Sequence, residues 1–161
     1  LSGHNIVKSS LFEDTDMAKK WRENGERSYC INGMNIINVR MYDSFIKIWK
    51  GFEKNSYPSF KNNLFFFIFH IFNLLIFNLP IISIPLHLLG VINNSALFGC
   101  GVIIILIRLL FSLKFRQPWW SFLFHSFAET IFLLISISSF VKYNFLGGIE
   151  WKDRKYGKQI K

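Results

Sequence analysis

Hydrophobic and polar positions divide this chain of 161 residues into three stretches. Charged side chains recur throughout residues 1–57, apolar tracts dominate residues 58–146, and residues 147–161 are polar again. The change is abrupt at Lys61, after which apolar residues follow almost without a break. A polar stretch joined directly to a long apolar tract predicts a protein that works at a membrane face, with its acids and bases held beside the lipid.

Two helices are predicted in the polar stretch. The first begins at the acidic run of residues 13–16, because acids stabilise the positive end of a helix dipole, and Gly25 ends it. The second covers residues 42–54, where apolar side chains recur at helical spacing on one face, namely Phe45, Ile48, Trp49 and Phe52. Helices therefore account for most of the order expected before the apolar tract.

A pair of short strands is predicted between these two helices. Residues 29–31 and 36–39 are rich in aromatic and β-branched side chains, and the turn signal Asn32-Gly33 separates them. The polar stretch should therefore have a mixed fold of mostly helices with two short strands.

Three apolar segments follow, at about 64–86, 91–113 and 121–141. At about 1.5 Å per residue, each is long enough to cross a hydrocarbon core of roughly 30 Å. Pro80 and Pro85 predict a kink or an early exit in the second half of the first segment. Glu129 interrupts the third segment, and it should face protein or water because an acid facing lipid is costly. A helix-packing hydrogen bond and a role in substrate handling both stay open for this residue.

Basic residues indicate which ends of the apolar segments share one side of the membrane. They are frequent in residues 1–61 and 142–161, and Lys114 and Arg116 follow the second segment, where Arg108 can extend toward the surface. Such residues favour the cytoplasmic side. Two spans place all three groups of basic residues on the cytoplasmic side if the third segment is re-entrant or interfacial, whereas three full spans would place the tail outside. We expect an integral membrane protein with two clear spans, a third helix of uncertain depth and a cytoplasmic polar stretch.

Composition argues against several classes of protein. The basic residues of the polar stretch are mixed with acids and no nucleic-acid-binding motif accompanies them, so we expect no nucleic-acid partner. Cys30 and Cys100 are far apart, which predicts no disulfide framework and fits a reducing compartment or simple burial. No metal-type Cys/His spacing is present, and we assign no metal ligand.

Three groups of residues carry candidate chemistry. The carboxylates of Glu13, Asp14 and Asp16 suit a general base, a cation or an oriented hydroxyl, although this motif alone favours a simple acidic helix start. The second group, Arg40 to Asn55, mixes basic and aromatic residues that suit a diphosphate or a sugar-like group, or simply a basic helix lying on anionic lipid. The third, residues 147–156, is a basic aromatic tail that follows the last apolar segment.

Taken in order, these motifs resemble the C-terminal half of membrane-bound family 2 glycosyltransferases, of the group that glycosylates carotenoid-acid and hopanoid-type lipids. The resemblance covers nearly the whole chain. It rests on Gly3-His4, Glu13-Asp14-Thr-Asp16-Met-Ala18, Gly25, Arg40-Met-Tyr42, Trp49-Lys-Gly51-Phe52-Glu-Lys54-Asn55 and Trp151-Lys-Asp-Arg154-Lys-Tyr156. The fold it implies is the C-terminal piece of a GT-A type α/β domain, followed by two or three transmembrane or interfacial helices.

The resemblance implies a role for each candidate residue. Asp14 would be the catalytic base that deprotonates the acceptor hydroxyl, with Glu13 beside it, in an inverting transfer from a nucleotide-sugar to a lipid-soluble acceptor in the membrane. His4 would border the acceptor site, and Arg40 and Lys54 would contact the diphosphate or a lipid headgroup. The other implied substrate-binding residues are Asp16, Trp49, Phe52, Trp151, Arg154 and Tyr156. The chain lacks the Gln-x-x-Arg-Trp form of the family's aromatic motif, and Asp153 stands where the family commonly has Gly.

The resemblance also implies that the donor site lies in a nucleotide-binding half that would precede Leu1. In that half an Asp-x-Asp motif would hold Mg²⁺ or Mn²⁺. We therefore expect the 161-residue chain alone not to transfer sugar. The alternative is a small non-catalytic membrane protein, either a subunit or a scaffold. A transporter is the weakest reading, because one intramembrane acid makes a poor pathway.

Overall fold

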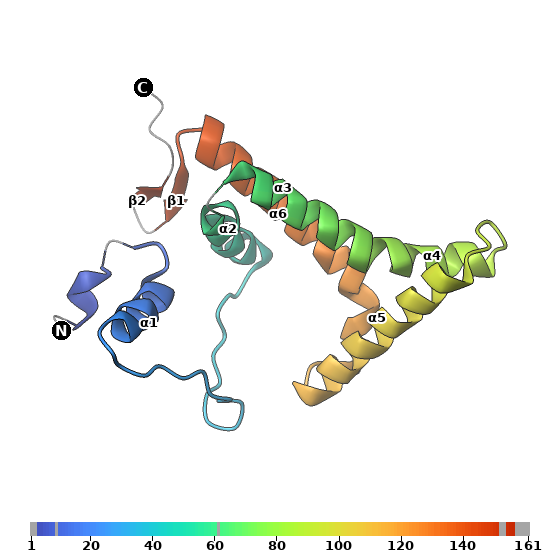
Figure 1. Ribbon diagram of the computed structural model, residues 1–161, viewed down its shortest axis with the longest axis horizontal. Coiled ribbons are helices and arrows are strands. Elements are labelled where there is room, and N and C mark those ends of the chain that lie inside the picture. The colour runs from blue at the N-terminus through green and yellow to red at the C-terminus, as the bar shows by residue number, and fades with distance from the viewer. Residues whose placement is uncertain (1–2, 9, 61, 152–153, 157–161) are drawn as a thin grey trace.

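The computed structural model describes residues 3–8, 10–60, 62–151 and 154–156. The apolar helices form an elongated arm, and the polar elements gather at one end of it (Figure 1). In chain order the helices and strands are η1 (Gly3–Ile6), α1 (Glu13–Glu23), α2 (Phe45–Ser56), η2 (Tyr57–Ser59), α3 (Asn63–Asn73), η3 (Leu74–Asn78), α4 (Leu79–Leu88), α5 (Ser95–Lys114), η4 (Trp119–Phe124), α6 (His125–Phe145), β1 (Ile149–Trp151) and β2 (Arg154–Tyr156).

The two helices predicted in the polar stretch are confirmed. Helix α1 begins at the acidic run, and its chain leaves through Gly25, whose φ of 82° is a left-handed conformation that glycine adopts without strain. Helix α2 begins after Ser44, whose hydroxyl accepts a hydrogen bond from the backbone N–H of Lys47.

The two strands predicted between these helices are wrong. Residues 26–44 contain a turn at 34–36 but no strand, and apolar side chains there are largely exposed, with Ile31 82 % and Ile36 84 % exposed. A strand needs a neighbouring strand for its backbone hydrogen bonds, and the described residues offer none beside this segment. The two short strands form at the other end of the chain, where β1 pairs antiparallel with β2.

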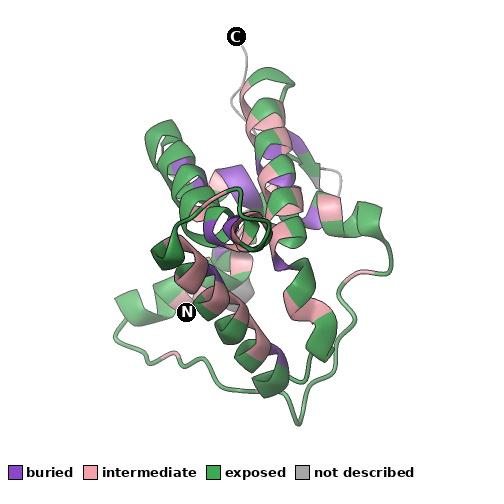
Figure 2. Cartoon of the chain, turned by 90° about the vertical axis from the view of Figure 1, so that its right-hand side faces the viewer, coloured by how far each residue is buried: buried purple, intermediate pink, exposed green. Residues whose placement is uncertain are grey.

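Three helical stretches are long and apolar enough to cross a membrane: Asn63–Leu88, Ser95–Lys114 and Trp119–Phe145. At most 22 % of the most apolar window in each is buried within the protein. Their outer faces are exposed over most of their length (Figure 2). Apolar helices with so much exposed side-chain surface fit a lipid environment, which is compatible with the predicted membrane protein.

The first of these stretches is continuous through its prolines rather than broken by them. Residues Leu74–Asn78 form a π turn, in which the backbone N–H of Leu79 donates to the carbonyl of Leu74, five residues back. Pro80 follows directly and has neither an N–H to donate nor room against the preceding turn. The wider π turn accommodates this proline, so the helix continues to Leu88.

Helices α4 and α5 pack closely at one glycine. A Cβ added at Gly101 would come within 2.3 Å of the carbonyl oxygen of Pro80. Gly101 is buried, whereas Gly99 on the same helix has open space around it. The close approach of the two helices therefore depends on Gly101 lacking a side chain.

The two ends of the apolar region lie together. Tyr57, just before α3, packs its ring 5.1 Å from those of Phe140 and Tyr143 near the end of α6. An odd number of complete crossings would place these ends on opposite sides of a membrane. This contact therefore favours the predicted arrangement, in which one of the three apolar helices does not cross completely.

The third stretch turns back along the other two. The hydroxyls of Ser112 and Ser121 are 2.8 Å apart, so η4 runs back along the end of α5. Helix α6 then begins beside the middle of the first stretch, where the rings of His125 and Phe77 lie 6.1 Å apart. Two clear spans with a third helix of uncertain depth stay a prediction.

Candidate functional site

The acidic start of α1 places the proposed base in an accessible position. Asp14 is exposed, and one of its carboxylate oxygens accepts a hydrogen bond of 2.9 Å from the backbone N–H of Thr15. Asp16 accepts from the hydroxyl of Ser10, which also accepts from the backbone N–H of Phe12. These bonds fix the direction in which the chain enters the helix, while the Asp14 side chain stays exposed.

A shallow cavity of about 240 Å³ lies between η1 and α1. Asp16 lines it, whereas Asp14 and Glu13 do not. The other lining residues combine apolar and charged side chains: Ile6, Val7, Ser10, Lys19, Lys20 and Glu23. The structure therefore separates Asp16, which faces this cavity, from the proposed base.

Helix α2 presents its aromatic residues outward and buries a polar face. The Phe52 ring is 47 % exposed and lies 6.5 Å from the rings of Tyr42 and Phe132. Trp49 is half-buried, with its ring 6.0 Å from that of Phe45. Lys54 is also half-buried. Because this helix ends where the apolar tract begins, its outward aromatic face suits the membrane surface.

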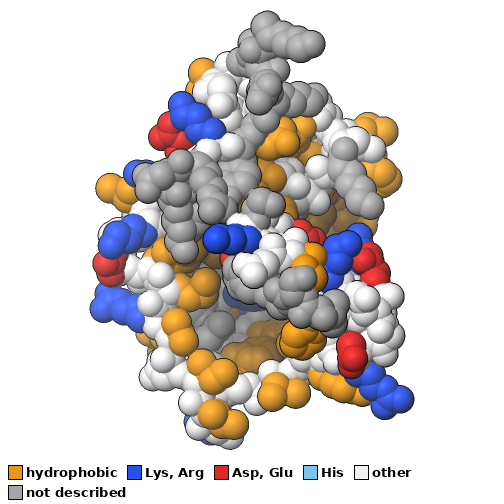
Figure 3. Space-filling model, turned by 90° about the vertical axis from the view of Figure 1, so that its left-hand side faces the viewer, with side chains coloured by type: hydrophobic (Ala, Val, Ile, Leu, Met, Phe, Trp, Pro, Cys, Tyr) orange, Lys and Arg blue, Asp and Glu red, His pale blue; other side chains and the backbone are white. Residues whose placement is uncertain are grey.

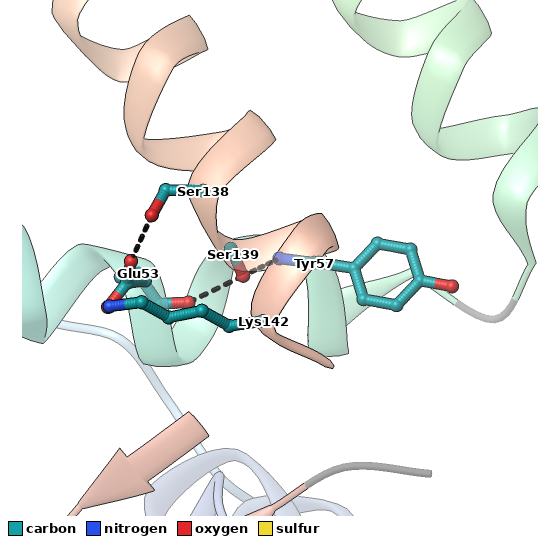
Figure 4. A network of polar contacts seen from close by, with 5 residues as sticks. All are labelled: Glu53, Tyr57, Ser138, Ser139 and Lys142. Atoms are coloured by element: carbon teal, nitrogen blue, oxygen red, sulfur yellow. Dashed lines mark hydrogen bonds and ion pairs between the residues drawn. The ribbon is translucent and has the colours of Figure 1, made fainter. Parts of the chain in front are cut away.

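The buried face of α2 joins α6 through a polar network (Figure 4). The Glu53 side chain is 4 % exposed and accepts a hydrogen bond of 2.9 Å from Lys142 Nζ and another from the Ser138 hydroxyl. Ser139 donates to the backbone carbonyl of Glu53 at 2.6 Å and accepts from the backbone N–H of Tyr57 at 3.0 Å. A buried acid with an ion pair and a hydroxyl donor is well compensated, so this network fixes α2 on α6.

The sequence reasoning missed this network, although a signal for it was present. Ser136, Ser138, Ser139 and Lys142 interrupt an otherwise apolar helix, and the three serines lie within one turn of one another. Polar side chains in a membrane helix usually face protein. Ser136 does so as well, because its hydroxyl lies 2.6 Å from that of Ser56.

The remaining candidate residues fall on three separate elements. Arg40 is exposed in the segment without helix or strand, and His4 lies in η1, where the backbone is described but the side chain is not. Trp151 pairs with Arg154 across the hairpin, and Tyr156 pairs with Ile149. The side chains of Trp151, Arg154 and Tyr156 lie outside the described part. The buried Ile149 anchors this hairpin, so the tail is folded back on the molecule.

Charged and apolar side chains alternate over the polar end of the molecule (Figure 3). Lys47 pairs with Asp43 at 2.7 Å, and the Asp43 pKa is lowered chiefly by this hydrogen bond. Lys20 and Glu23 lie 3.3 Å apart on α1. This end therefore offers both signs of charge beside lipid-facing apolar side chains.

The described residues do not fit a metal centre. Within them, no group of three or more His, Cys, Asp and Glu side chains is arranged to hold an ion.

The fold and the polar junction define a membrane protein whose polar elements are fixed at one end of its apolar helices. Searches against protein-family models, curated proteins and solved structures gave no match to this chain.

Proposed function

We propose that this protein supplies the catalytic base and the acceptor side of an inverting family 2 glycosyltransferase that acts on a membrane lipid. The donor is a nucleotide-sugar, and the acceptor is a lipid-soluble alcohol or acid that stays in the bilayer. The polar stretch is the C-terminal piece of a GT-A type domain, and it faces the cytoplasm.

The proposed reaction needs one proton transfer and one displacement. The Asp14 carboxylate takes the proton of the acceptor hydroxyl as its oxygen attacks the anomeric carbon of the sugar. The bond from that carbon to the diphosphate oxygen breaks, and the nucleoside diphosphate leaves with the electron pair. Attack opposite the leaving group inverts the anomeric centre. Arg40 and Lys54 offer positive charge to the departing diphosphate.

The observation that carries this proposal is the attachment of the polar stretch to the membrane helices. Glu53, buried on α2, holds Lys142 of α6 at 2.9 Å, at the end of the apolar arm where the polar elements gather (Figure 1). A lipid that diffuses in the bilayer thus reaches polar side chains without leaving the membrane. The Asp14 carboxylate on α1 is exposed, so an acceptor hydroxyl can approach it.

Substitution of Asp14 by Asn in the full-length protein tests the proposal. Asn keeps the shape of the side chain and removes the base, so turnover with a nucleotide-sugar and a lipid extract should fall about 10²-fold to 10⁴-fold. Asp43→Asn is the matched control, because Asp43 is also an exposed acid in the polar stretch but pairs with Lys47. Near-normal turnover in Asp14→Asn would show that Asp14 is not the base.

A non-catalytic subunit or scaffold is the second candidate, and one observation favours it. The segment 26–44 exposes Tyr29, Ile31, Ile36, Val39 and Met41 by 68–84 % each. Apolar surface of this extent suits contact with another protein. A stable complex recovered from mild detergent, with no sugar transfer by wild-type protein, would support this candidate over the enzyme.

A further inference from the structure

A cluster of ionisable side chains lies within the apolar arm, away from the polar end. His125 Nδ1 on α6 is 3.9 Å from a Glu129 carboxylate oxygen. Arg108 on α5 lies one turn before Ser112, whose hydroxyl is 2.8 Å from that of Ser121, one turn before His125. Arg108 was expected to extend toward the surface beside Lys114, but its Nε atom is buried.

The cluster lies at the depth of the middle of the first apolar stretch. The ring of Phe77 contacts that of His125, and Phe77 belongs to the π turn Leu74–Asn78, midway along Asn63–Leu88. Ionisable residues at such a depth are costly, and π turns are frequent at functional sites. Both features favour a function for this cluster beyond helix packing.

Three buried polar atoms in and beside the cluster have no hydrogen-bond partner within the described part of the chain. They are Arg108 Nε, His125 Nε2 and Ser126 Oγ, and the His125 side chain is only 8 % exposed. An arginine N–H can only donate, and a serine hydroxyl can also donate. Buried donors without acceptors are rare because each costs free energy. An oxygen atom supplied by a ligand would satisfy them.

The charges of the cluster favour an uncharged oxygen. The positive charge of Arg108 is offset by the Glu129 carboxylate, so an added anion would meet repulsion from that acid. The Glu129 side chain is 29 % exposed, so the cluster reaches the surface of α6. This helix belongs to a stretch apolar enough to cross a membrane, so that surface suits lipid rather than water.

We propose that Arg108, His125 and Glu129 form an intramembrane binding site for a lipid-soluble molecule that carries a hydroxyl or carbonyl oxygen. The oxygen accepts from Arg108 Nε, and a hydroxyl also bonds with His125 Nε2 in either tautomer. The apolar body of the molecule lies along the outer face of the apolar helices. This site is distinct from Asp14, because α1 lies at the polar end of the molecule (Figure 1) and the site lies midway along the arm, and it does not depend on sugar transfer.

Photolabelling of the whole chain in phosphatidylcholine vesicles tests the site. The probe is a long-chain primary alcohol with a diazirine in its chain, compared with the diazirine hydrocarbon of equal length. The alcohol should label peptides from α5 and α6 at least about fivefold more strongly, as one or two hydrogen bonds predict. Arg108→Met should reduce labelling by the alcohol to the level of the hydrocarbon. Lys114→Met, a basic residue on the same helix outside the cluster, should leave it unchanged.

Competition on the wild-type chain makes the test independent of how the variants fold. Excess unlabelled alcohol should abolish the additional labelling, and excess hydrocarbon should not. Equal labelling by the two probes, or labelling that unlabelled alcohol does not displace, would overturn the proposal. Unchanged labelling in folded Arg108→Met and His125→Phe would likewise assign the cluster to helix packing alone.

Discussion

The buried ion pair between α2 and α6 should respond very differently to loss of its two partners. In Lys142→Met, the Glu53 carboxylate loses its cation but stays buried, since its side chain is 4 % exposed. In Glu53→Gln, the remaining Lys142 is 41 % exposed and can turn toward water. The structure therefore predicts that the lysine substitution is the more damaging of the two, although both remove one ion pair.

The magnitudes follow from what each variant leaves behind. A buried charge without its partner lowers the free energy of unfolding by about 3–5 kcal/mol. In Lys142→Met the Ser138 hydroxyl still donates to the Glu53 carboxylate, so we expect a loss near the lower value, about 3 kcal/mol. Glu53→Gln replaces a charged hydrogen-bond acceptor by a neutral one, so it should lower the free energy of unfolding by about 1 kcal/mol. The double variant should recover part of the loss of Lys142→Met, because its buried group is neutral. Lys155→Met is the matched control, as the pair of Lys155 with Glu150 is about 70 % exposed and contributes about 0.5 kcal/mol or less.

Equilibrium unfolding in bicelles measures these free energies, followed by circular dichroism and by fluorescence of Trp49 in a chain whose other four tryptophans are replaced by phenylalanine. Trp49 lies on α2 and reports its detachment from α6. If Lys142→Met costs no more than Glu53→Gln, or if the double variant is the least stable, burial of the Glu53 carboxylate does not govern the stability of this junction.

Two further predictions concern single positions outside this network. Gly101→Ala should destabilise the fold by about 1–3 kcal/mol, because its Cβ meets the carbonyl of Pro80. Gly99→Ala on the same helix should cost nothing measurable by the same unfolding assay. Equal losses in the two variants would contradict the close approach of α4 and α5 at Gly101. The pKa of Asp43 should lie below its ordinary value and should rise in Lys47→Met, as measured by NMR titration. The stabilisation from this pair is therefore complete at pH values above the ordinary pKa, and it is lost as the pH falls through the lowered pKa of the folded protein. An Asp43 pKa that does not change in Lys47→Met would disprove this assignment.

Helices and apolar segments were predictable because their signals are local. The acidic run at residues 13–16 and Gly25 bound α1 correctly, and the three apolar segments correspond to the helices that are long enough to span. The failed strands at 29–31 and 36–39 had strand-forming composition but no partner strand in the described residues. Residue preference alone does not supply the neighbour that a strand requires.

The polar junction was not predictable from local pattern. Glu53 and Lys142 are 89 positions apart, and only the return of α6 to the start of α3 brings them together. The basic residues at both ends of the apolar region predicted that these ends share one side of the membrane, but they did not predict which side chains meet there. Likewise, Arg108 looked like a surface residue from its place near the end of α5, and only the neighbouring α6 gives it partners within the arm.

Thiol accessibility in sealed vesicles tests most directly whether the polar stretch and the tail share one membrane face. Cys30 and Cys100 are both free and exposed, so they are first replaced by serine. Single cysteines at Asn55, Leu146 and Val91, all exposed, are then treated with a membrane-impermeant maleimide. We predict that Asn55→Cys and Leu146→Cys react from the same side and Val91→Cys from the other. Reaction of the first two from opposite sides would mean three full crossings and would contradict the junction between α2 and α6.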